Sequence, residues 1–138
     1  MASGATLTVD LPAVTDSVPR ARHAVLAFVE TCSLPEKLLN QVALAVTEAV
    51  SNTVRHAYAG RHPGSIFLRA SLDSATLEVT VRDEGTGIQP KPKSDGMGMG
   101  IPLMARLADD LQIVSGAENG GTRVTMRFGL GPKRRQSL

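Results

Sequence analysis

The sequence predicts an α+β fold: a two-layer sandwich in which helices cover one face of a mixed, mostly antiparallel sheet. Three observations lead to this fold class. Segments with a period of two alternate with segments of helical period, in the order strand, helix, helix, strand, strand, helix, strand, strand. The strands fall in adjacent hairpins, and the two long helices are grouped between them. The length of 138 residues suits one domain, so we expect residues 1–138 to form a single unit with a basic tail at about 129–138.

The expected elements follow from the spacing of apolar residues. A period of two marks a strand, and apolar residues three or four apart mark a helix. Asp73-Ser74 and the glycine turn at residues 118–121 supply the short polar residues that favour hairpins. The expected strands are residues 5–10, 66–72, 77–81, 111–114 and 122–128, and the expected helices are residues 15–32, about 35 to about 57, and 101–107.

Start signals accompany the first two helices. Asp16 or Ser17 can cap the first helix with a side-chain oxygen, because the first backbone N–H groups of a helix have no partner within it. Ser33 and Glu36 have the spacing of a capping box at the start of the second helix. Cys32 lies in an apolar helical pattern, so we expect it to be a small core residue.

Composition narrows the class of function. Apolar residues make up 42% of the chain and charged residues 20%, as in ordinary globular proteins. Aromatic residues make up only 3%, which argues against a stacking platform for nucleic acid. The net charge is +2, and part of it lies in Lys133-Arg134-Arg135, which we interpret as a solvated tail. The single cysteine excludes an internal disulfide, and no apolar run approaches the roughly 20 residues of a membrane span. We therefore expect a cytoplasmic protein without direct nucleic-acid or membrane contact.

Glu48, Asn52 and His56 are spaced four residues apart in the second predicted helix, so they share one of its faces. One interpretation is a solvated stripe on an amphipathic helix. The other is a magnesium and phosphate site, because Mg²⁺ prefers hard oxygen ligands and takes few of them from protein. Asn52 would then supply a carboxamide oxygen, and Glu48 would orient or deprotonate an attacking hydroxyl or water. His56 can reach a phosphate or cap the helix C-terminus, and we favour the cap.

Asp83 directly follows a predicted strand and begins the segment Asp83-Glu-Gly85-Thr-Gly87. An aspartate at a strand end commonly serves the turn itself. The alternative is recognition of adenine, because a carboxylate accepts a hydrogen bond from the exocyclic amine. Gly85 and Gly87 would let the backbone lie against the ring. Glu84 is expected to face solvent.

A glycine-rich loop precedes the third predicted helix. It consists of Gly96, Met97, Gly98, Met99 and Gly100. Glycines permit a close backbone approach, so the N–H groups of this loop and the helix N-terminus can hold phosphate oxygens. A flexible linker is the alternative. Met97 and Met99 line the nucleotide pocket or pack beneath the loop, and Lys91 and Lys93, just before it, are assigned to solvent.

These motifs occur in a defined order. They are Glu48 with Asn52, Asp83 with Gly85 and Gly87, Gly98 with Gly100, and Gly121 with Thr122. In this order they resemble the N-box and glycine boxes of the GHKL ATPase superfamily, over residues 35 to 128. Within that superfamily, residues 47–58, 81–88 and 98–104 look most like the motifs of bacterial anti-sigma factors that are serine/threonine kinases.

The resemblance implies the Bergerat ATP-binding fold, with ATP and Mg²⁺ as ligands. It also implies transfer of the γ-phosphate to a Ser or Thr of a STAS-type anti-anti-sigma protein, inhibitory binding of a sigma factor, and a homodimer. By that likeness Asp83 contacts adenine, with Thr122 near it, and Asn52 holds Mg²⁺. Glu48 is the general base, and Gly98 and Gly100 belong to the phosphate loop.

Two features leave alternatives open. Arg22 falls near a partner-contacting arginine of these anti-sigma factors, and the other interpretation is a surface arginine with no such role. The stretch between Gly87 and Gly96 is shorter than the ATP lid of many family members. We therefore expect an ATP-dependent protein kinase, and the alternative is a module that binds ATP and sequesters a sigma factor without phosphotransfer.

Overall fold

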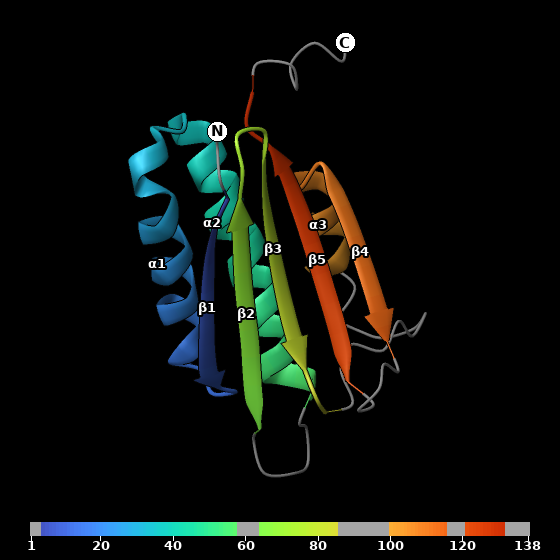
Figure 1. Cartoon of the computed structure of the whole chain (residues 1–138). Coiled ribbons are helices and arrows are strands. Elements are labelled where there is room, and N and C mark those ends of the chain that lie inside the picture. Colours follow the sequence, from blue (N-terminus) through green and yellow to red (C-terminus); the bar gives the residue numbers. More distant parts are fainter. Residues whose placement is uncertain (1–3, 58–63, 86–99, 116–120, 132–138) are drawn as a thin grey trace.

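The computed structural model of the chain describes residues 4–57, 64–85, 100–115 and 121–131 (Figure 1). The strands are β1 (Ala5–Pro12), β2 (Ser65–Leu72), β3 (Thr76–Asp83), β4 (Asp110–Ser115) and β5 (Thr122–Gly129). The helices are α1 (Ser17–Val29), α2 (Glu36–Asn52) and α3 (Gly100–Leu107), with a 3₁₀ turn at Glu30–Cys32 and a π-helical turn at Thr53–Ala57. Each predicted strand and helix is therefore present, in the predicted order.

The strands form one sheet in the order β1-β2-β3-β5-β4. Every pair of neighbouring strands in the described part of the chain is antiparallel. The sequence analysis predicts a mixed, mostly antiparallel sheet, and the described strands show antiparallel pairing throughout. β2 and β3 follow each other directly in the chain, as do β4 and β5. β3 and β5 are also neighbours in the sheet, although α3 and β4 lie between them in the sequence.

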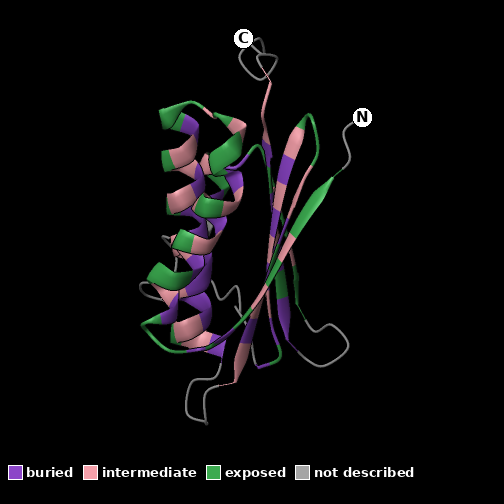
Figure 2. Ribbon diagram, turned by 60° about the vertical axis from the view of Figure 1, so that its left-hand side comes forward, coloured by how far each residue is buried: buried purple, intermediate pink, exposed green. Residues whose placement is uncertain are grey.

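The helices cover one face of the sheet and leave the other face open (Figure 2). The alternation along β3 shows how the sequence produces this layering, because its residues are buried and partly exposed in turn. Leu77, Val79 and Val81 point into the core, and Glu78 and Thr80 lie on the open face. Asp83 continues the buried set, so the strand ends with a carboxylate on the helix side.

The core lies between α1, α2 and the inner face of the sheet. In α2 the buried residues recur at helical spacing, so one face of the helix is apolar along its length. They are Leu38, Val42, Ala45, Val46, Ala49, Val50 and Asn52. Asn52 is the only polar member of this set, at the C-terminal end of the helix.

The predicted helix caps are wrong in detail. Asp16 occupies the N-cap position of α1 without a side-chain cap, and the Ser17 hydroxyl instead donates to the Pro12 carbonyl oxygen at 2.5 Å. Pro35, not Ser33, is the N-cap residue of α2. Ser33 has a φ of 53° and ends the preceding 3₁₀ turn, so it stands too far from the first turn of α2 to cap it.

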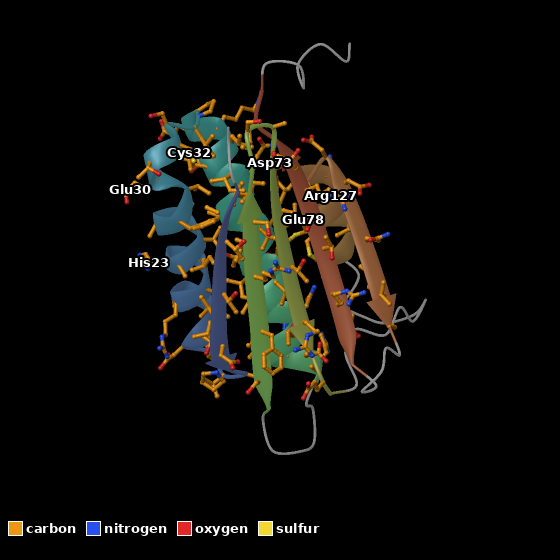
Figure 3. All side chains as sticks on the ribbon, in the orientation of Figure 1. His23, Glu30, Cys32, Asp73, Glu78 and Arg127 are labelled. Atoms are coloured by element: carbon orange, nitrogen blue, oxygen red, sulfur yellow. The ribbon has the colours of Figure 1, made fainter. Side chains whose placement is uncertain are left out.

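Cys32 is also placed differently from the prediction. It lies in the 3₁₀ turn at the junction of α1 and α2, and it is half-exposed (Figure 3). The helical pattern of α1 ends at Val29, so the following residues rotate away from the core. No helix among the described residues is long and apolar enough to cross a membrane.

Candidate functional site

Asp83 is a buried carboxylate at the end of β3, with 3% of its surface exposed. Its Oδ1 accepts a hydrogen bond from the Gly85 backbone N–H at 3.0 Å, and the Thr122 backbone N–H also donates to the carboxylate. Burial raises the pKa of the Asp83 carboxyl, and these two hydrogen bonds oppose the rise. The side chain is thus fixed in direction, on the helix side of the sheet.

Gly121 brings β5 into close contact with the end of β3. A Cβ atom at this position would lie 1.8 Å from the Asp83 carbonyl oxygen and 2.7 Å from the Glu84 Cα. No side chain fits at these distances, so glycine is required by the contact itself. Thr122 follows with 2% of its surface exposed, beside Asp83. The Gly-Thr pair found in the sequence therefore builds one wall of the Asp83 site.

Asn52 and Glu48 lie one turn apart near the C-terminal end of α2. Asn52 is 3% exposed, and its buried Nδ2 has no hydrogen-bond partner within the described residues. A buried polar atom without a partner is costly and uncommon. Glu48 is half-buried and forms no ion pair with any described residue. The helix thus presents a carboxylate without an ion pair and a carboxamide nitrogen without a hydrogen-bond partner, as far as the described residues go.

The helix changes its geometry immediately after Asn52. Residues Thr53–Ala57 form a π-helical turn, and the Thr53 hydroxyl donates to the Ala49 carbonyl oxygen at 3.1 Å. π-Helical turns are rare and are often found at functional sites. Glu48 and Asn52 lie within the α-helix, whereas His56 lies in the π-helical turn.

His56 lies in the π-helical turn and is half-buried. Burial and the neighbouring Arg55 cation lower the pKa of its imidazole. A neutral imidazole lacks the positive charge that would favour a helix C-terminus. The lowered pKa reduces the charged fraction of His56, and the preferred capping role stays a prediction.

The site residues converge at one end of the molecule. α2 and β3 both end there, and β5 begins there, at the lower end of Figure 1. Asn52, Asp83 and Thr122 are all buried at this end. Gly100 begins α3. Gly87, Met97, Gly98 and Met99, together with Lys91 and Lys93, lie outside the described residues.

Arg22 has a contact that the sequence did not indicate. Its Nη1 donates to the Thr47 hydroxyl at 3.0 Å, and that hydroxyl donates to the Ala43 carbonyl oxygen at 2.8 Å. Arg22 therefore ties α1 to α2 at the residue beside Glu48. The two residues are 25 positions apart, and no local pattern links them. Glu84 is exposed, as predicted.

Comparison with known proteins places these features in a family. Residues 11–128 match the sequence model of the histidine kinase-like ATPase domain. The chain is 34% identical over 106 residues to an anti-sigma F factor of Halalkalibacterium halodurans, which covers 69% of this chain and 73% of that protein. It is 33% identical over 113 residues to an anti-sigma F factor of Bacillus cytotoxicus, which covers 74% and 77%.

Solved structures show the same fold. A Mycobacterium tuberculosis structure that comprises RsbU and RsbW domains matches with a TM-score of 0.71 at 20% identity, over 90% of this chain and 32% of that chain. A blue-light activated histidine kinase of Erythrobacter litoralis matches with a TM-score of 0.60 at 26% identity, over 74% of this chain and 33% of the other. The chain therefore corresponds to about a third of each of these larger structures.

Proposed function

This chain belongs to the histidine kinase-like ATPase domain family, with anti-sigma F factors among its relatives, and we propose that it is an ATP- and Mg²⁺-dependent serine/threonine kinase. Its substrate in this proposal is a Ser or Thr of a STAS-type anti-anti-sigma protein. It also binds a sigma factor and works as a homodimer, so that phosphorylation of one partner controls release of the other.

The buried Asp83 carboxylate carries the nucleotide part of the proposal. Burial of a carboxylate is unfavourable unless the group is paired or performs a task. Two backbone N–H groups hold Asp83 in place, and an adenine amine would supply a further donor to the same carboxylate. Thr122 lies beside it, where the nucleobase would sit.

Asn52 supports the metal part of the proposal. Its carboxamide is buried, and Nδ2 lacks a partner within the described residues. The terminal torsion of asparagine is broad, so the group can rotate to present its oxygen. Mg²⁺ keeps several waters and phosphate oxygens and needs few protein ligands, which suits a single carboxamide. Bound Mg²⁺ would neutralise the charge of the phosphates.

Glu48 is the proposed general base. It lies one helical turn before Asn52, so its carboxylate faces the same region as the proposed metal ligand. It forms no ion pair with any described residue, which leaves it free to accept a proton. In the proposed step Glu48 takes the proton of the Ser or Thr hydroxyl as the hydroxyl oxygen bonds to the γ-phosphorus, and ADP leaves with the electron pair of the broken bond.

Calorimetry tests the nucleotide site. The measurement is ATP binding with and without Mg²⁺ by wild type, Asp83→Asn and Asn52→Ala. We expect Asp83→Asn to weaken binding under both conditions, because the adenine contact does not involve the metal. Asn52→Ala should remove most of the gain that Mg²⁺ gives. If folded wild type binds no ATP, the proposed function is wrong.

Glu48→Ala separates a kinase from a module that only binds ATP. The readout is transfer of radiolabelled phosphate to a purified STAS-type protein, next to ATP affinity. We expect phosphotransfer to fall by about 10²-fold or more while ATP affinity changes little. Phosphotransfer that is absent in wild type, with ATP binding intact, would leave the sequestering module as the function.

A further inference from the structure

Four arginines lie close together on the open face of the sheet. A shallow hollow of about 500 Å³ lies on it, between strands β1 and β4. Arg69, Arg82, Arg123 and Arg127 line this hollow, and Glu78 is the only carboxylate among its described lining residues. The arginines come from β2, β3 and β5, the three central strands.

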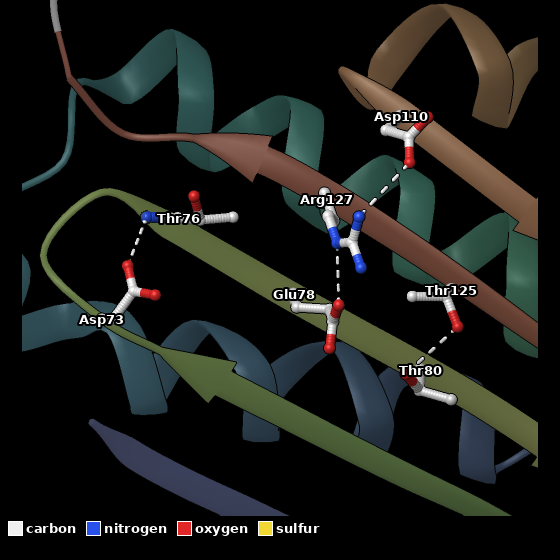
Figure 4. Close-up of polar contacts among 7 residues, drawn as sticks. All are labelled: Asp73, Thr76, Glu78, Thr80, Asp110, Thr125 and Arg127. Carbon is white, nitrogen blue, oxygen red and sulfur yellow. Dashed lines mark hydrogen bonds and ion pairs between the residues drawn. The ribbon is translucent and has the colours of Figure 1, made fainter.

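Arg127 is neutralised within the protein. Its Nε donates to the Glu78 carboxylate at 2.8 Å, and its Nη1 lies 3.6 Å from the Asp110 carboxylate (Figure 4). This network occupies the part of the face near the β2–β3 turn. Both acids of this network, Glu78 and Asp110, already contact Arg127.

The remaining three arginines form what we call the arginine cluster: Arg69, Arg82 and Arg123. Arg82 and Arg123 are directly opposite each other on β3 and β5. Arg69 is opposite Thr80 on β2 and β3, so it is diagonal to Arg82. At this spacing, neighbouring Cβ atoms are about 5 Å apart when opposite and about 7 Å apart on the diagonal.

The cluster has little internal compensation. Arg82 lies 3.2 Å from the Glu84 carboxylate, and its guanidinium stacks over the Phe67 ring at 4.2 Å from the centroid. Arg69 and Arg123 are exposed and form no ion pair with any residue that the structure describes. Like charges directly opposite each other destabilise a sheet. The fold therefore gains no stability from placing Arg123 across from Arg82.

We propose that the arginine cluster is a docking site for a short acidic segment of a partner protein. A guanidinium binds a carboxylate through two parallel hydrogen bonds, and the described face uses arginine and no lysine at these positions. Thr80 and Thr125 lie between the arginines and add hydroxyl groups for further polar contacts. Carboxylates of the partner would supply the charge that the cluster lacks.

The shape of the charge pattern favours a short acidic peptide over a nucleic acid. Phe67 lies across from Arg82 on one side and across from Asp10 of β1 on the other, so Asp10 ends this row of residues. Glu78 and Asp110 lie on the side of the cluster toward the β2–β3 turn. A phosphate backbone that extended beyond the cluster would meet these carboxylates. The chain also has a net charge of only +2, whereas nucleic-acid binding depends on a continuous basic surface.

The cluster and the proposed nucleotide site share backbone. Arg82 precedes Asp83 on β3, and Arg123 follows Thr122 on β5. Because side chains alternate along a strand, each pair points to opposite faces of the sheet. The docking proposal itself does not require the proposed kinase activity, since the cluster lies wholly on the open face.

Fluorescence anisotropy with a labelled oligoglutamate peptide and the full chain tests the proposal. The variant is the double change Arg69→Gln and Arg123→Gln, and the matched control is Arg20→Gln and Arg106→Gln. The control alters two exposed arginines on α1 and α3 and removes the same charge. We expect the first pair to raise the Kd by about tenfold or more, because each lost arginine removes charge-assisted hydrogen bonds. The control should change the Kd by less than about twofold.

Three results would overturn the proposal. Equal losses in both double variants would show only an effect of net charge. Tighter binding of a labelled oligothymidylate, lost in the same variant, would make the face a phosphate surface. Wild-type dimers in sedimentation that the Arg69 and Arg123 changes dissociate, with no competition by oligoglutamate, would show that the face binds a second copy. ATP affinity of the same variants is measured in parallel, so a failure of docking is distinguishable from a failure of the nucleotide site.

Discussion

The two ends of the β2–β3 hairpin each carry an aspartate, and the protein holds the two in opposite ways. At the turn, Asp73 is exposed and accepts hydrogen bonds from the Ala75 and Thr76 N–H groups at 2.8 and 2.9 Å. These bonds lower the pKa of Asp73. At the other end, Asp83 is buried, and burial raises the pKa of its carboxyl. The first aspartate stabilises a turn, and the second is held at a cost that a bound ligand would offset.

Polar groups elsewhere in the molecule follow the same division. Near the turn, Arg127 lies between Glu78 and Asp110 (Figure 4). At the other end, Asn52 keeps a buried Nδ2 without a partner in the described residues, and Gly121 leaves no room for a side chain. Satisfied polar groups are typical of structural regions, whereas unsatisfied buried ones often mark sites of function. The comparison therefore locates the site independently of any sequence motif.

The largest effect is expected from Gly121→Ala. Its Cβ would lie 1.8 Å from the Asp83 carbonyl oxygen, so β3 and β5 must separate at the site. We expect the free energy of unfolding to fall by about 3 kcal/mol and ATP binding to be lost. Gly131→Ala is the control, because nothing lies within 4 Å of its Cβ position. Chemical denaturation of the two variants gives the measurement, and equal stability would show that the contact imposes no constraint.

The pH dependence of stability should have opposite signs for the two aspartates. The raised pKa of Asp83 means that the folded state binds the carboxyl proton more tightly than the unfolded state does. This contribution to stability is present below the ordinary pKa of about 3.9, and it is lost as pH rises through the folded pKa. The lowered pKa of Asp73 gives stability above that ordinary value, which is lost as pH falls through the folded pKa.

Asp83→Asn and Asp73→Asn test this difference. The measurement is thermal unfolding of the apoprotein between acid and neutral pH. The pH dependence of stability should lose the Asp83 contribution in Asp83→Asn and the Asp73 contribution in Asp73→Asn. We also expect Asp83→Asn to weaken ATP binding by about tenfold or more, because hydrogen bonds to a charged group are strong. Asp73→Asn should leave ATP affinity unchanged. The same pH profile in both variants would contradict the opposite pKa shifts.

Asn52→Leu should separate binding from stability. The side chain has a similar volume, and the substitution removes a buried Nδ2 that has no partner in the described residues. Replacement of such a group by an apolar one is close to neutral or stabilising, so we expect a change of less than about 1 kcal/mol in the free energy of unfolding. ATP should no longer bind with a benefit from Mg²⁺.

Ser17→Ala is the matched control, because Ser17 is equally buried but its hydroxyl donates to the Pro12 carbonyl oxygen. We expect it to lose about 1 kcal/mol of stability with ATP binding intact. A larger loss for Asn52→Leu than for Ser17→Ala would mean that the Asn52 carboxamide has a structural role.

Sequence periodicity was sufficient for the fold because burial in this protein follows the strand and helix periods closely. β3 alternates without exception, and one face of α2 is apolar along its length. The same alternation places the Asp83 side chain on the helix side of the sheet. The ends of the helices were less predictable. Whether Ser33 or Asp16 caps a helix depends on the local backbone angles and not on residue type alone.

Parts of the site depend on contacts that no local pattern encodes. The close approach of Gly121 to Asp83 joins residues on two strands that are distant in sequence, and the Arg22–Thr47 hydrogen bond joins two helices. The π-helical turn after Asn52 is equally invisible to a period of 3.6 residues, and the shared face of His56 with Glu48 stays a prediction. Nor does residue spacing distinguish a neutralised arginine such as Arg127 from an unpaired one.

The smallest effect is expected at the turn end of the comparison, from Arg127→Gln. Arg127 reaches Glu78 and Asp110, and the Glu78 contact raises the pKa of its guanidinium. However, its side chain is 49% exposed, so water and salt screen both ion pairs. We therefore expect only a small loss of stability in chemical denaturation, and a smaller loss at high salt. ATP affinity should not change, since this network is made entirely of exposed groups near the β2–β3 turn. A loss as large as that of Gly121→Ala, or a fall in ATP affinity, would show that the two ends of the sheet are coupled rather than separate in their roles.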